Sequence, residues 1–364
     1  MRSAALAQQI GQLLWVGFAG SDMTARLVER ISRGEIGAII LFARNITTLD
    51  QLCYLTGRLH DAAPPETPLL IAVDQEGGRV QRIRAPATEW PPMLRLGELA
   101  LRRGTAEAEA LAAQVGRALG RELAALGFDI DFAQVLDVHT NPANPVIGDR
   151  AFATTPELAA LLAGAFARGL AAAEILGCGK HFPGHGDTAL DSHLALPRIP
   201  HAMERLGAVE LVPFRALSWL PILMTAHVVF AALDDTLPAT LSPLVVDGLL
   251  RRTLGYEGVI VSDDLEMKAI ADHFGLEDAI ERGLLAGCDA FLLCKQEDLQ
   301  LRAAAALTHA AERSSKVRER IAESAARVVA LKHGHFAAGR NRPPRSVVGC
   351  AEHREIAAQL LAVE

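Results

Sequence analysis

The sequence of 364 residues is poor in cysteine, and the cysteines it has are scattered. They stand at positions 53, 178, 288, 294 and 350, and no two of them form a CxxC pair. This spacing excludes a dense disulfide framework and argues against a zinc site made of paired thiolates. We therefore expect free, buried thiols in a protein of a reducing compartment.

An excess of positive charge and long apolar runs are also missing. The formal net charge is −7, which excludes the basic footprint that is typical of a nucleic-acid-binding protein. No apolar stretch approaches the ~20 residues that a membrane-spanning helix needs, and Gln8, Gln9 and Gln12 interrupt the apolar part of the N-terminus. We expect a cytoplasmic protein that binds neither nucleic acid nor a membrane.

Short apolar runs are what the sequence does have, and they alternate with longer segments rich in Ala, Leu, Arg and Glu. Continuous apolar runs of this length are typical of strands that are buried on both faces of a parallel sheet. The alternation predicts βαβ units, and eight of them predict a single-domain α/β fold, the (β/α)8 barrel. An open doubly wound sheet is the alternative, although the GxGxxG motif of its dinucleotide-binding form is absent. The runs cover residues 13–18, 37–42, 68–74, 128–138, 176–182, 221–227, 258–264 and 288–294.

The pattern predicts one catalytic domain, residues 1–338, followed by a C-terminal tail, residues 339–364, that packs on the barrel or extends from it. The only Pro/Arg-rich break, "GRNRPPRS", begins this tail and follows a helical region at about 298–337. Residues 105–127 are predicted to form a helix that ends at Gly127. A second helical segment, 155–177, has Thr155 as its N-cap and Pro156 at its first position.

Titratable side chains gather where the predicted strands end, whereas the residues at the starts of the same strands are uncharged. In a barrel, the carboxyl ends of the strands form the rim that carries the chemistry. Carboxylates accept hydrogen bonds from sugar hydroxyls and cations donate to them, so this rim suits a polyhydroxylated substrate. Taken alone, Asp74 is equally consistent with an acid that caps a turn, and each arginine with a solvated surface residue. The side chains in question are Asp74, Glu76, Arg79, Arg82, Asp149, Arg150, Lys180, His181, His227, Asp263, Asp264 and Glu266.

Two of these positions have different interpretations. Asp263 and Asp264 directly follow "VIVS", which places one of the two acids toward the barrel axis and indicates a functional carboxylate. His227, in "MTAH", we interpret as a core histidine that is hydrogen-bonded to a backbone carbonyl.

The stretch "KHFPGHGDTALDSHLALP", residues 180–197, is the richest in titratable groups. A loop that presents His185, Asp187 and His193 to a metal is one interpretation, although the nearby proline and glycines argue against a helical zinc pair. The other is acid–base chemistry. In an extended segment Asp191 and His193 project to the same side, and a carboxylate beside an imidazole makes a proton shuttle near neutral pH.

Several motifs together resemble family 3 glycoside hydrolases of the bacterial cytoplasmic β-N-acetylglucosaminidase type, which recycle peptidoglycan fragments. Besides "KHFPGHGDTALDSH", the motifs that match, in the family's order and across most of the predicted barrel, are "DQEGGRVQR" (74–82), "NPVIGDRAF" (144–152), "MTAHVVF" (224–230) and "VSDDLEM" (261–267). The resemblance implies a (β/α)8 fold.

The resemblance also implies roles for individual residues. Asp263 is the expected nucleophile, and His193, assisted by Asp191, is the expected acid/base. The residues expected to hold the sugar are Asp74, Arg82, Arg150, Lys180 and His181. The implied reaction removes terminal non-reducing β-linked N-acetylglucosamine from GlcNAc-1,6-anhydro-MurNAc, with or without its peptide, by double displacement.

We expect no metal and no cofactor, and a protein that acts as a monomer on a carbohydrate substrate. Two other functions stay open: a β-glucosidase-type relative with a different sugar specificity, and a metal-dependent barrel hydrolase. No task is assigned to His185 or to Asp264.

Overall fold

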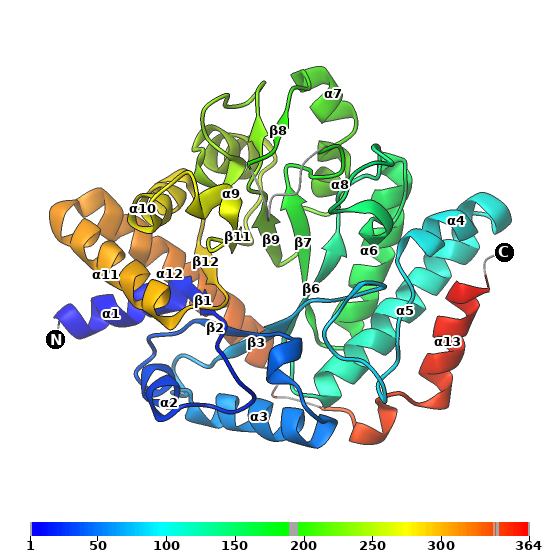
Figure 1. Cartoon of the computed structure of the whole chain (residues 1–364), viewed down its shortest axis with the longest axis horizontal. Coiled ribbons are helices and arrows are strands. Elements are labelled where there is room, and N and C mark those ends of the chain that lie inside the picture. Colours follow the sequence, from blue (N-terminus) through cyan, green and yellow to red (C-terminus); the bar gives the residue numbers. More distant parts are fainter. Residues whose placement is uncertain (1, 189–195, 338, 340–341, 363–364) are drawn as a thin grey trace.

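The computed structural model describes residues 2–188, 196–337, 339 and 342–362. Eight strands among these residues form the barrel: β1 (Leu14–Val16), β2 (Ala38–Leu41), β3 (Leu70–Val73), β6 (Ile130–Val135), β7 (Leu176–Phe182), β9 (Ile222–Thr225), β11 (Val259–Asp264) and β12 (Ala290–Leu293). They are parallel and close in the order β1-β12-β11-β9-β7-β6-β3-β2 (Figure 1). Each strand lies within one of the predicted apolar runs. The predicted (β/α)8 barrel is therefore confirmed, and the open sheet is wrong.

Helices surround the barrel, and smaller elements decorate its ends. The helices are α1 (Arg2–Leu13), α2 (Ala25–Ser32), α3 (Leu49–Ala62), α4 (Leu94–Arg103), α5 (Thr105–Ala125), α6 (Pro156–Ala172), α7 (Met203–Ala208), α8 (Leu211–Ala216), α9 (Lys268–Ala271), α10 (Leu276–Ala286), α11 (Glu297–Arg313), α12 (Ser315–Phe336) and α13 (Ala351–Leu361). Short helical segments are η1 (Ala43–Asn45), η2 (Gly148–Arg150), η3 (Ala239–Leu241), η4 (Leu244–Thr253, a π-helix) and η5 (Arg345–Val347). Two small sheets pair β4 (Gln75–Gly77) with β5 (Val80–Gln81), and β8 (Arg198–Ile199) with β10 (Val229–Phe230).

Alternate residues of the strands pack into two separate apolar layers, as expected for a filled barrel. On β2, Ala38 and Ile40 belong to the inner layer, whereas Ile39 and Leu41 pack against the surrounding helices. The inner layer also holds Trp15 and Phe132, whose rings stack at a centroid distance of 6.5 Å. The barrel interior is thus a packed core, and chemistry is confined to its ends.

Helix α12 covers the amino-terminal end of the barrel. Its Val328 packs against the inner layer. Its Lys332 donates a hydrogen bond to Gln12, which precedes β1. Its His335 Nε2 lies 3.4 Å from Oδ1 of Asp129, which precedes β6. Because this end is closed by a helix, a ligand can reach the barrel only from the carboxyl ends of the strands.

The helix boundaries agree in part with the sequence pattern. Helix α5 ends at Ala125, and Gly127 follows with a φ of 89°, the left-handed conformation expected just past a helix end. Helix α6 begins at Pro156 as predicted, but Thr155 makes no side-chain cap bond. It ends at Ala172 rather than at residue 177, because the chain turns at Glu174 before β7.

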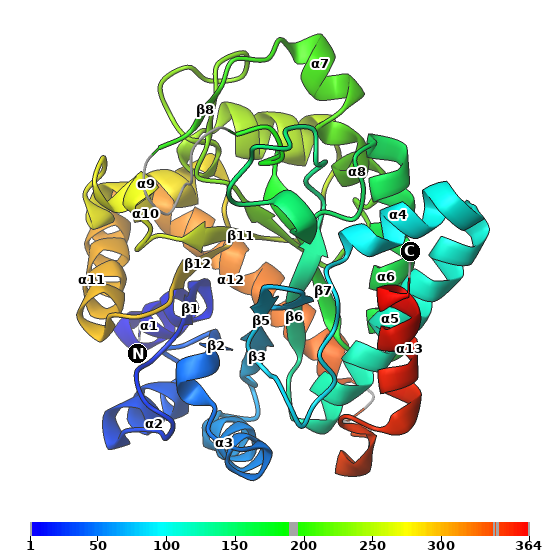
Figure 2. The same cartoon turned by 45° about the vertical axis from the view of Figure 1, so that its right-hand side comes forward.

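Within the part of the chain that the structure describes, every helix is too short or too polar to cross a membrane. All five cysteines are free, as their spacing predicts. Helix α13, in the predicted tail, packs on α5 and α4 (Figure 2).

Candidate active site

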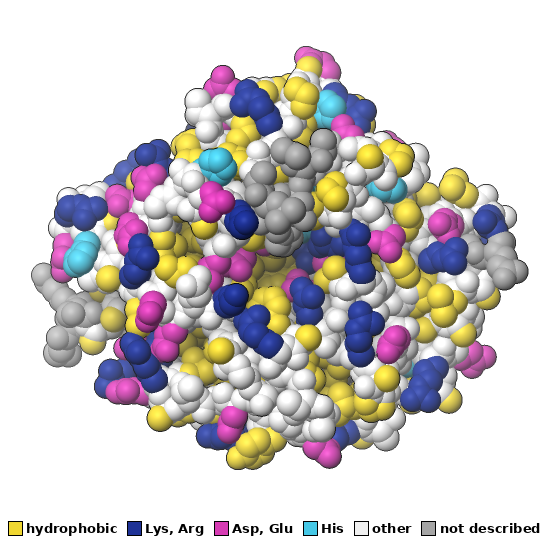
Figure 3. Space-filling model, in the orientation of Figure 1, with side chains coloured by type: hydrophobic (Ala, Val, Ile, Leu, Met, Phe, Trp, Pro, Cys, Tyr) yellow, Lys and Arg dark blue, Asp and Glu magenta, His cyan; other side chains and the backbone are white. Residues whose placement is uncertain are grey.

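A cavity of about 330 Å³ lies at the carboxyl ends of the barrel strands, within the ~300–1,000 Å³ range of small-molecule sites. Its apolar lining includes Phe42, Phe132, Met224 and Leu292. Figure 3 shows a hollow near the centre of one face, with Lys, Arg, Asp and Glu side chains around it. Six residues predicted for the site line this cavity: Asp74, Arg82, Arg150, Lys180, His181 and Asp263.

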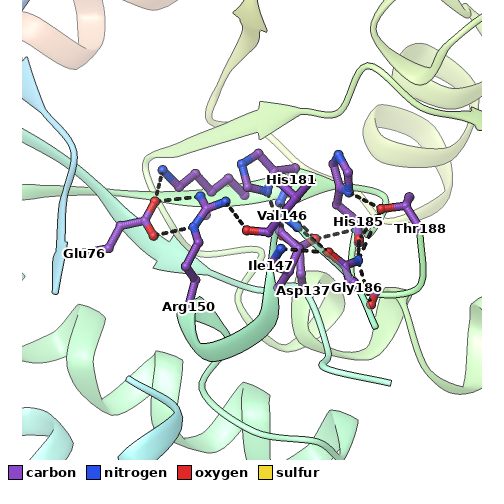
Figure 4. Close-up of polar contacts among 12 residues, drawn as sticks. Glu76, Asp137, Val146, Ile147, Arg150, His181, His185, Gly186 and Thr188 are labelled. Atoms are coloured by element: carbon purple, nitrogen blue, oxygen red, sulfur yellow. Dashed lines mark hydrogen bonds and ion pairs between the residues drawn. The ribbon is translucent and has the colours of Figure 1, made fainter. Parts of the chain in front are cut away.

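Ionic side chains from three strand ends form one network, which we call the charged cluster (Asp74, Glu76, Arg82, Arg150 and Lys180). Lys180, on β7, donates to Asp74 Oδ1 at 3.1 Å and lies 2.5 Å from Glu76 Oε1. Arg82 donates to the other oxygen of Asp74 at 3.1 Å. Arg150, at the end of η2, makes a two-pronged bond to Glu76, from Nε at 2.7 Å and from Nη2 at 2.8 Å (Figure 4). Such paired bonds fix the orientation of both side chains.

Four members of the charged cluster, Asp74, Glu76, Arg150 and Lys180, stay ionised despite burial. Burial raises the pKa of Glu76, but the attraction of Arg150 and Lys180 outweighs it and lowers that pKa to about 2. Burial likewise raises the pKa of Asp74, and Lys180 and Arg82 bring it below its ordinary value. Burial lowers the pKa values of Lys180 and Arg150, yet the same carboxylates raise both above their ordinary values. The cluster therefore presents rigid, charged acceptors and donors to the cavity.

A second network surrounds Asp137, a fully buried aspartate just beyond β6. Its carboxylate lies 2.6 Å from His181 Nδ1 and accepts the backbone N–H of His185 at 2.6 Å. Burial raises the pKa of Asp137, and the attraction of His181 outweighs it, so the pKa lies below its ordinary value. An ionised Asp137 fixes the His181 ring with Nδ1 as the donor, which leaves Nε2 as the nitrogen for other partners.

The loop after β7 is held at its start by Asn144. The Asn144 side-chain N–H₂ donates to the carbonyls of His185 and Gly186 at 2.9 and 3.0 Å and to Thr188 Oγ1 at 3.2 Å. Its carbonyl oxygen accepts the backbone N–H groups of Val146 and Ile147, both at 2.8 Å. The segment 144–150, which carries Arg150, and the segment 185–188 are thereby joined (Figure 4).

His185 and Asp187, considered for a metal from the sequence, have other contacts here. His185 is 1% exposed and its Nδ1 lies 2.8 Å from Thr188 Oγ1. Burial, with the nearby His181, lowers its pKa to about 4, so the ring is neutral near pH 7. Asp187 lies 2.5 Å from Nε2 of His201. The third candidate ligand, His193, lies outside the described residues.

Both aspartates at the end of β11 line the cavity. The sequence pattern indicated that one of the two would point toward the barrel axis. Asp263 Oδ1 accepts the backbone N–H of Asp264 at 2.8 Å. Asp264 Oδ1 accepts the backbone N–H groups of Glu266 and Cys294 at 3.1 and 3.3 Å. Burial raises the pKa of Asp264 to about 7, with nearby Glu266 and Asp263 adding to the rise. The neighbouring acids therefore have distinct environments.

His227 is the buried core histidine that the sequence predicted. Its Nε2 lies 3.1 Å from the carbonyl oxygen of Asp264, so Nε2 carries the hydrogen, and Nδ1 lies 2.9 Å from Thr240 Oγ1. Burial lowers its pKa, which keeps the ring neutral. His227 thus supports the backbone beside the two aspartates.

Two predicted catalytic residues, Asp191 and His193, lie outside the described residues. Two buried acids that organise the site were not predicted from the sequence. Glu76 stood among the rim residues without a role, although its place in "DQEGG" was a signal. Asp137 was not predicted as a site residue, although it ends a long apolar run in the same way as Asp74.

Comparison with known proteins identifies the family. The N-terminal domain of glycosyl hydrolase family 3 matches residues 5–331. A beta-hexosaminidase of Alkalilimnicola ehrlichii is 44% identical over 289 residues, which are 78% of this chain and 81% of that protein. A beta-hexosaminidase of Neisseria meningitidis serogroup C is 43% identical over 283 residues, 77% of each chain.

Solved structures lead to the same family. A family 3 β-N-acetylglucosaminidase from Paenibacillus has a TM-score of 0.89 at 39% identity, over 98% of this chain and 68% of that one. NagZ from Neisseria gonorrhoeae, in complex with N-trifluoroacetyl-D-glucosamine, has a TM-score of 0.78 at 34% identity, over 96% and 97% of the two chains. The resemblance seen in the motifs is confirmed: the chain belongs to glycosyl hydrolase family 3, among its beta-hexosaminidase members.

Proposed function

We propose that the protein is a retaining exo-glycosidase that removes terminal, non-reducing β-linked N-acetylglucosamine. The observation that carries the proposal is the position of Asp263 at the same cavity as the charged cluster. A fixed carboxylate beside ordered acceptors and donors is what a glycosidase needs, since one group reacts while the others hold the sugar hydroxyls. The names of the family 3 relatives support the sugar assignment.

In this proposal the charged cluster and His181 hold the sugar. Asp74 offers carboxylate oxygens to sugar hydroxyls, whereas Lys180 and Arg82 donate to hydroxyl oxygens. Glu76 and Asp137 act behind them, because one fixes Arg150 and Lys180 and the other fixes the ring of His181. The apolar lining at Phe42 and Leu292 suits the carbon faces of a pyranose ring.

The chemistry is a double displacement. Asp263 attacks the anomeric carbon, and His193, oriented by Asp191, protonates the leaving oxygen as the glycosidic bond breaks. A covalent glycosyl–Asp263 ester results. His193 then takes a proton from water, which attacks the anomeric carbon and releases Asp263 with net retention. The roles of Asp191 and His193 rest on the motif resemblance alone.

The substrate that we propose is GlcNAc-1,6-anhydro-MurNAc, with or without its peptide, encountered in the cytoplasm. These molecules carry carboxylates beyond the sugar that is cleaved. Arg44 and Lys295 line the cavity, and both residues are exposed, so the entrance offers cations to an anionic leaving group. The five free thiols are compatible with a reducing compartment.

A substrate comparison tests this function. We expect turnover of an aryl β-N-acetylglucosaminide and of GlcNAc-1,6-anhydro-MurNAc, with much weaker turnover of the matching aryl β-glucoside. Faster hydrolysis of the glucoside would favour the β-glucosidase-type alternative.

A parallel assay after dialysis against EDTA tests the metal-dependent alternative. That alternative requires that the glycosidase activity be lost on dialysis and return when metal is added. Proton NMR of the first product should show the β-anomer, and an α-anomer would contradict double displacement.

A further inference from the structure

One cluster of possible metal ligands lies away from the cavity, at the start of α13. The Cys350 sulfur, a Glu352 carboxylate oxygen and a ring nitrogen of His353 lie within 4.8 Å of one another. Helix α13 packs along α5 on the outside of the barrel (Figure 2). The spacing of this cluster differs from that of the CxxC pairs that form thiolate zinc sites.

A carboxylate of the barrel fixes the orientation of the buried His353 ring. It is 1% exposed, and its Nδ1 lies 2.9 Å from Glu122 Oε1, on α5. Glu122 also accepts the backbone N–H of Gly349 at 2.9 Å and the hydroxyl of Thr88 at 2.5 Å. An acceptor with so many donors is an ionised carboxylate, so Nδ1 carries the hydrogen.

The other ring nitrogen of His353, when it carries no hydrogen, offers a lone pair to a metal. Nε2 is buried and has no hydrogen-bond partner among the residues that the structure describes. An unpaired buried polar atom costs free energy unless a ligand or water satisfies it. A carboxylate that fixes Nδ1 while Nε2 faces a cation is the usual arrangement around a metal-bound histidine. The pair of Glu122 and His353 therefore points to a cation at Nε2.

Cys350 and Glu352 supply the remaining groups at an accessible position. Cys350 is a free, partly exposed thiol at the N-cap of α13. Glu352 is exposed, and its ion pair with Arg121 is long at 4.0 Å. An exposed ion pair of this kind contributes ~0–1 kcal/mol, so a metal would displace it at little cost.

We propose that Cys350, Glu352 and His353 bind a borderline-soft divalent cation, with Zn²⁺ as the best match, and that water completes a tetrahedral shell. A thiolate, an imidazole and a carboxylate are all ligands that Zn²⁺ takes. With Zn–S of ~2.3 Å and Zn–N of ~2.0–2.1 Å, the ligand atoms must close to roughly 3.3–3.8 Å, which the exposed Glu352 side chain can follow. Binding releases the thiol proton to solvent and leaves the oxidation state of sulfur and metal unchanged.

The bound ion stabilises the contact between α13, the last helix, and α5 on the outside of the barrel. All three ligands lie at the start of α13, and His353 links the ion to α5 through its hydrogen bond to Glu122. Since the unfolded chain does not hold the three ligands together, metal binding stabilises the docked form of α13. The site has no direct part in glycoside hydrolysis and does not depend on the function proposed above.

Cobalt titration of the full chain tests the site. After dialysis against a chelator, Co²⁺ is added to a protein with Asp263→Asn, which removes a carboxylate from the active-site cavity as a competing ligand. We expect about one Co²⁺ per chain with an intense thiolate-to-metal charge-transfer band in the near ultraviolet. Cys350→Ser should abolish the band, and Glu352→Gln should raise the Co²⁺ dissociation constant at least ~tenfold. Cys53→Ser, at another partly buried thiol, is the matched control and should keep the band.

Zinc gives a second, independent measurement. We expect Zn²⁺ to raise the melting temperature of the chelator-treated protein and of the Cys53→Ser control, and to leave that of Cys350→Ser unchanged. Cys350 and Glu352 are accessible, so both variants should fold, which circular dichroism checks. A charge-transfer band that persists in Cys350→Ser, or the lack of any thiolate band in the parent protein, would overturn the proposal.

Discussion

Asp263 and Asp264 are adjacent in the chain, yet the residue-scale environment separates them. Asp264 accepts two backbone N–H groups and has a pKa of about 7 because it is buried. Asp263 accepts the backbone N–H of its neighbour and lines the same cavity. The two aspartates are thus a natural matched pair for testing which one reacts.

Asp263→Asn and Asp264→Asn should have very different effects on kcat. Removing the nucleophile should lower kcat by more than the ~10²–10⁴-fold that general acid–base help contributes. In Asp264→Asn the new amide oxygen can still accept the two backbone bonds, so this variant should keep kcat within about tenfold. Rates with an aryl β-N-acetylglucosaminide measure both. Near-normal turnover by Asp263→Asn would remove it as the nucleophile.

The raised pKa of Asp264 also predicts a pH dependence of stability. Between pH 4 and 7 the folded state keeps a proton on Asp264 that the unfolded chain loses, so this residue makes the fold less stable as pH rises through that range. Asp264→Asn should therefore gain stability relative to the parent protein from pH 4 to pH 7. Denaturant unfolding at several pH values measures the difference. A difference that does not change with pH would contradict the raised pKa.

Asp74→Asn should act mainly on substrate binding. It replaces an ionised acceptor in the charged cluster and leaves Lys180 and Arg82 without their full partner, and hydrogen bonds to charged groups contribute ~1.5–3 kcal/mol. We expect kcat/KM to fall roughly 10–150-fold. Asp149→Asn is the control. Asp149 is more exposed than Asp74, and its Oδ1 lies 3.5 Å from Arg79 Nε. Equal losses in both variants would mean that Asp74 has no special role.

The charged residues of the site were predictable from the sequence to a limited extent. Their positions at strand ends follow from periodicity, and their roles from the motifs. Their pairing does not, because Lys180 meets Asp74 across 106 positions of the chain. The burial of Glu76 and Asp137 also depends on the packing of several loops, which no local pattern encodes.

At the scale of elements, strands were predicted better than helix ends. Continuous apolar runs mark buried parallel strands because both faces of each strand pack against other groups. The predicted helical region 298–337 is two helices, α11 and α12, which meet at Ser314. Ser314 accepts the backbone N–H of Val317 and so begins α12 as its N-cap. Because no glycine or proline lies at this break, the helical periodicity of the sequence predicts one continuous helix here.

Asp289→Ala should loosen the joint between α12 and the barrel. Asp289 precedes β12, is fully buried, and forms ion pairs with Arg251, Arg320 and Arg327, the last two on α12. Removing one partner of a buried ionic network typically costs ~3–5 kcal/mol, because it leaves buried charges unpaired. Asp278→Ala breaks an exposed pair with Arg282 and should cost below ~1 kcal/mol. Chemical denaturation of the two variants compares them, and equal losses would contradict the importance of this network.

At the scale of the whole molecule, one end of the barrel is sealed and the other is reactive. Helix α12 seals the amino-terminal end and brings in Lys332, which is 0% exposed and bonds to Gln12 Oε1 at 2.5 Å. Burial lowers the pKa of Lys332 to about 7. Nothing in the sequence indicates this, since lysines in amphipathic helices usually face solvent.

Lys332 predicts that stability changes with pH. From pH 7 to about 10 the unfolded chain holds a proton on this lysine that the folded protein lacks, so the fold gains ~1.4 kcal/mol per pH unit from it. Lys332→Met removes this gain, so the stability of the variant relative to the parent should fall as pH rises from 7 to 9. Lys316→Met, on the exposed face of α12, is the control. A constant difference for Lys332→Met would show that the lysine stays charged when buried.

The central claim is that Asp263 forms a covalent bond to the sugar, and mechanism-based trapping tests it most directly. The protein is incubated with a 5-fluoro-N-acetylglucosaminyl fluoride, which slows the second step, and is then digested and mapped by mass spectrometry. We expect one glycosylated peptide that contains Asp263, which the Asp264→Asn variant also forms and the Asp263→Asn variant does not. A label on another residue, or a label on the Asp263→Asn variant, would contradict it.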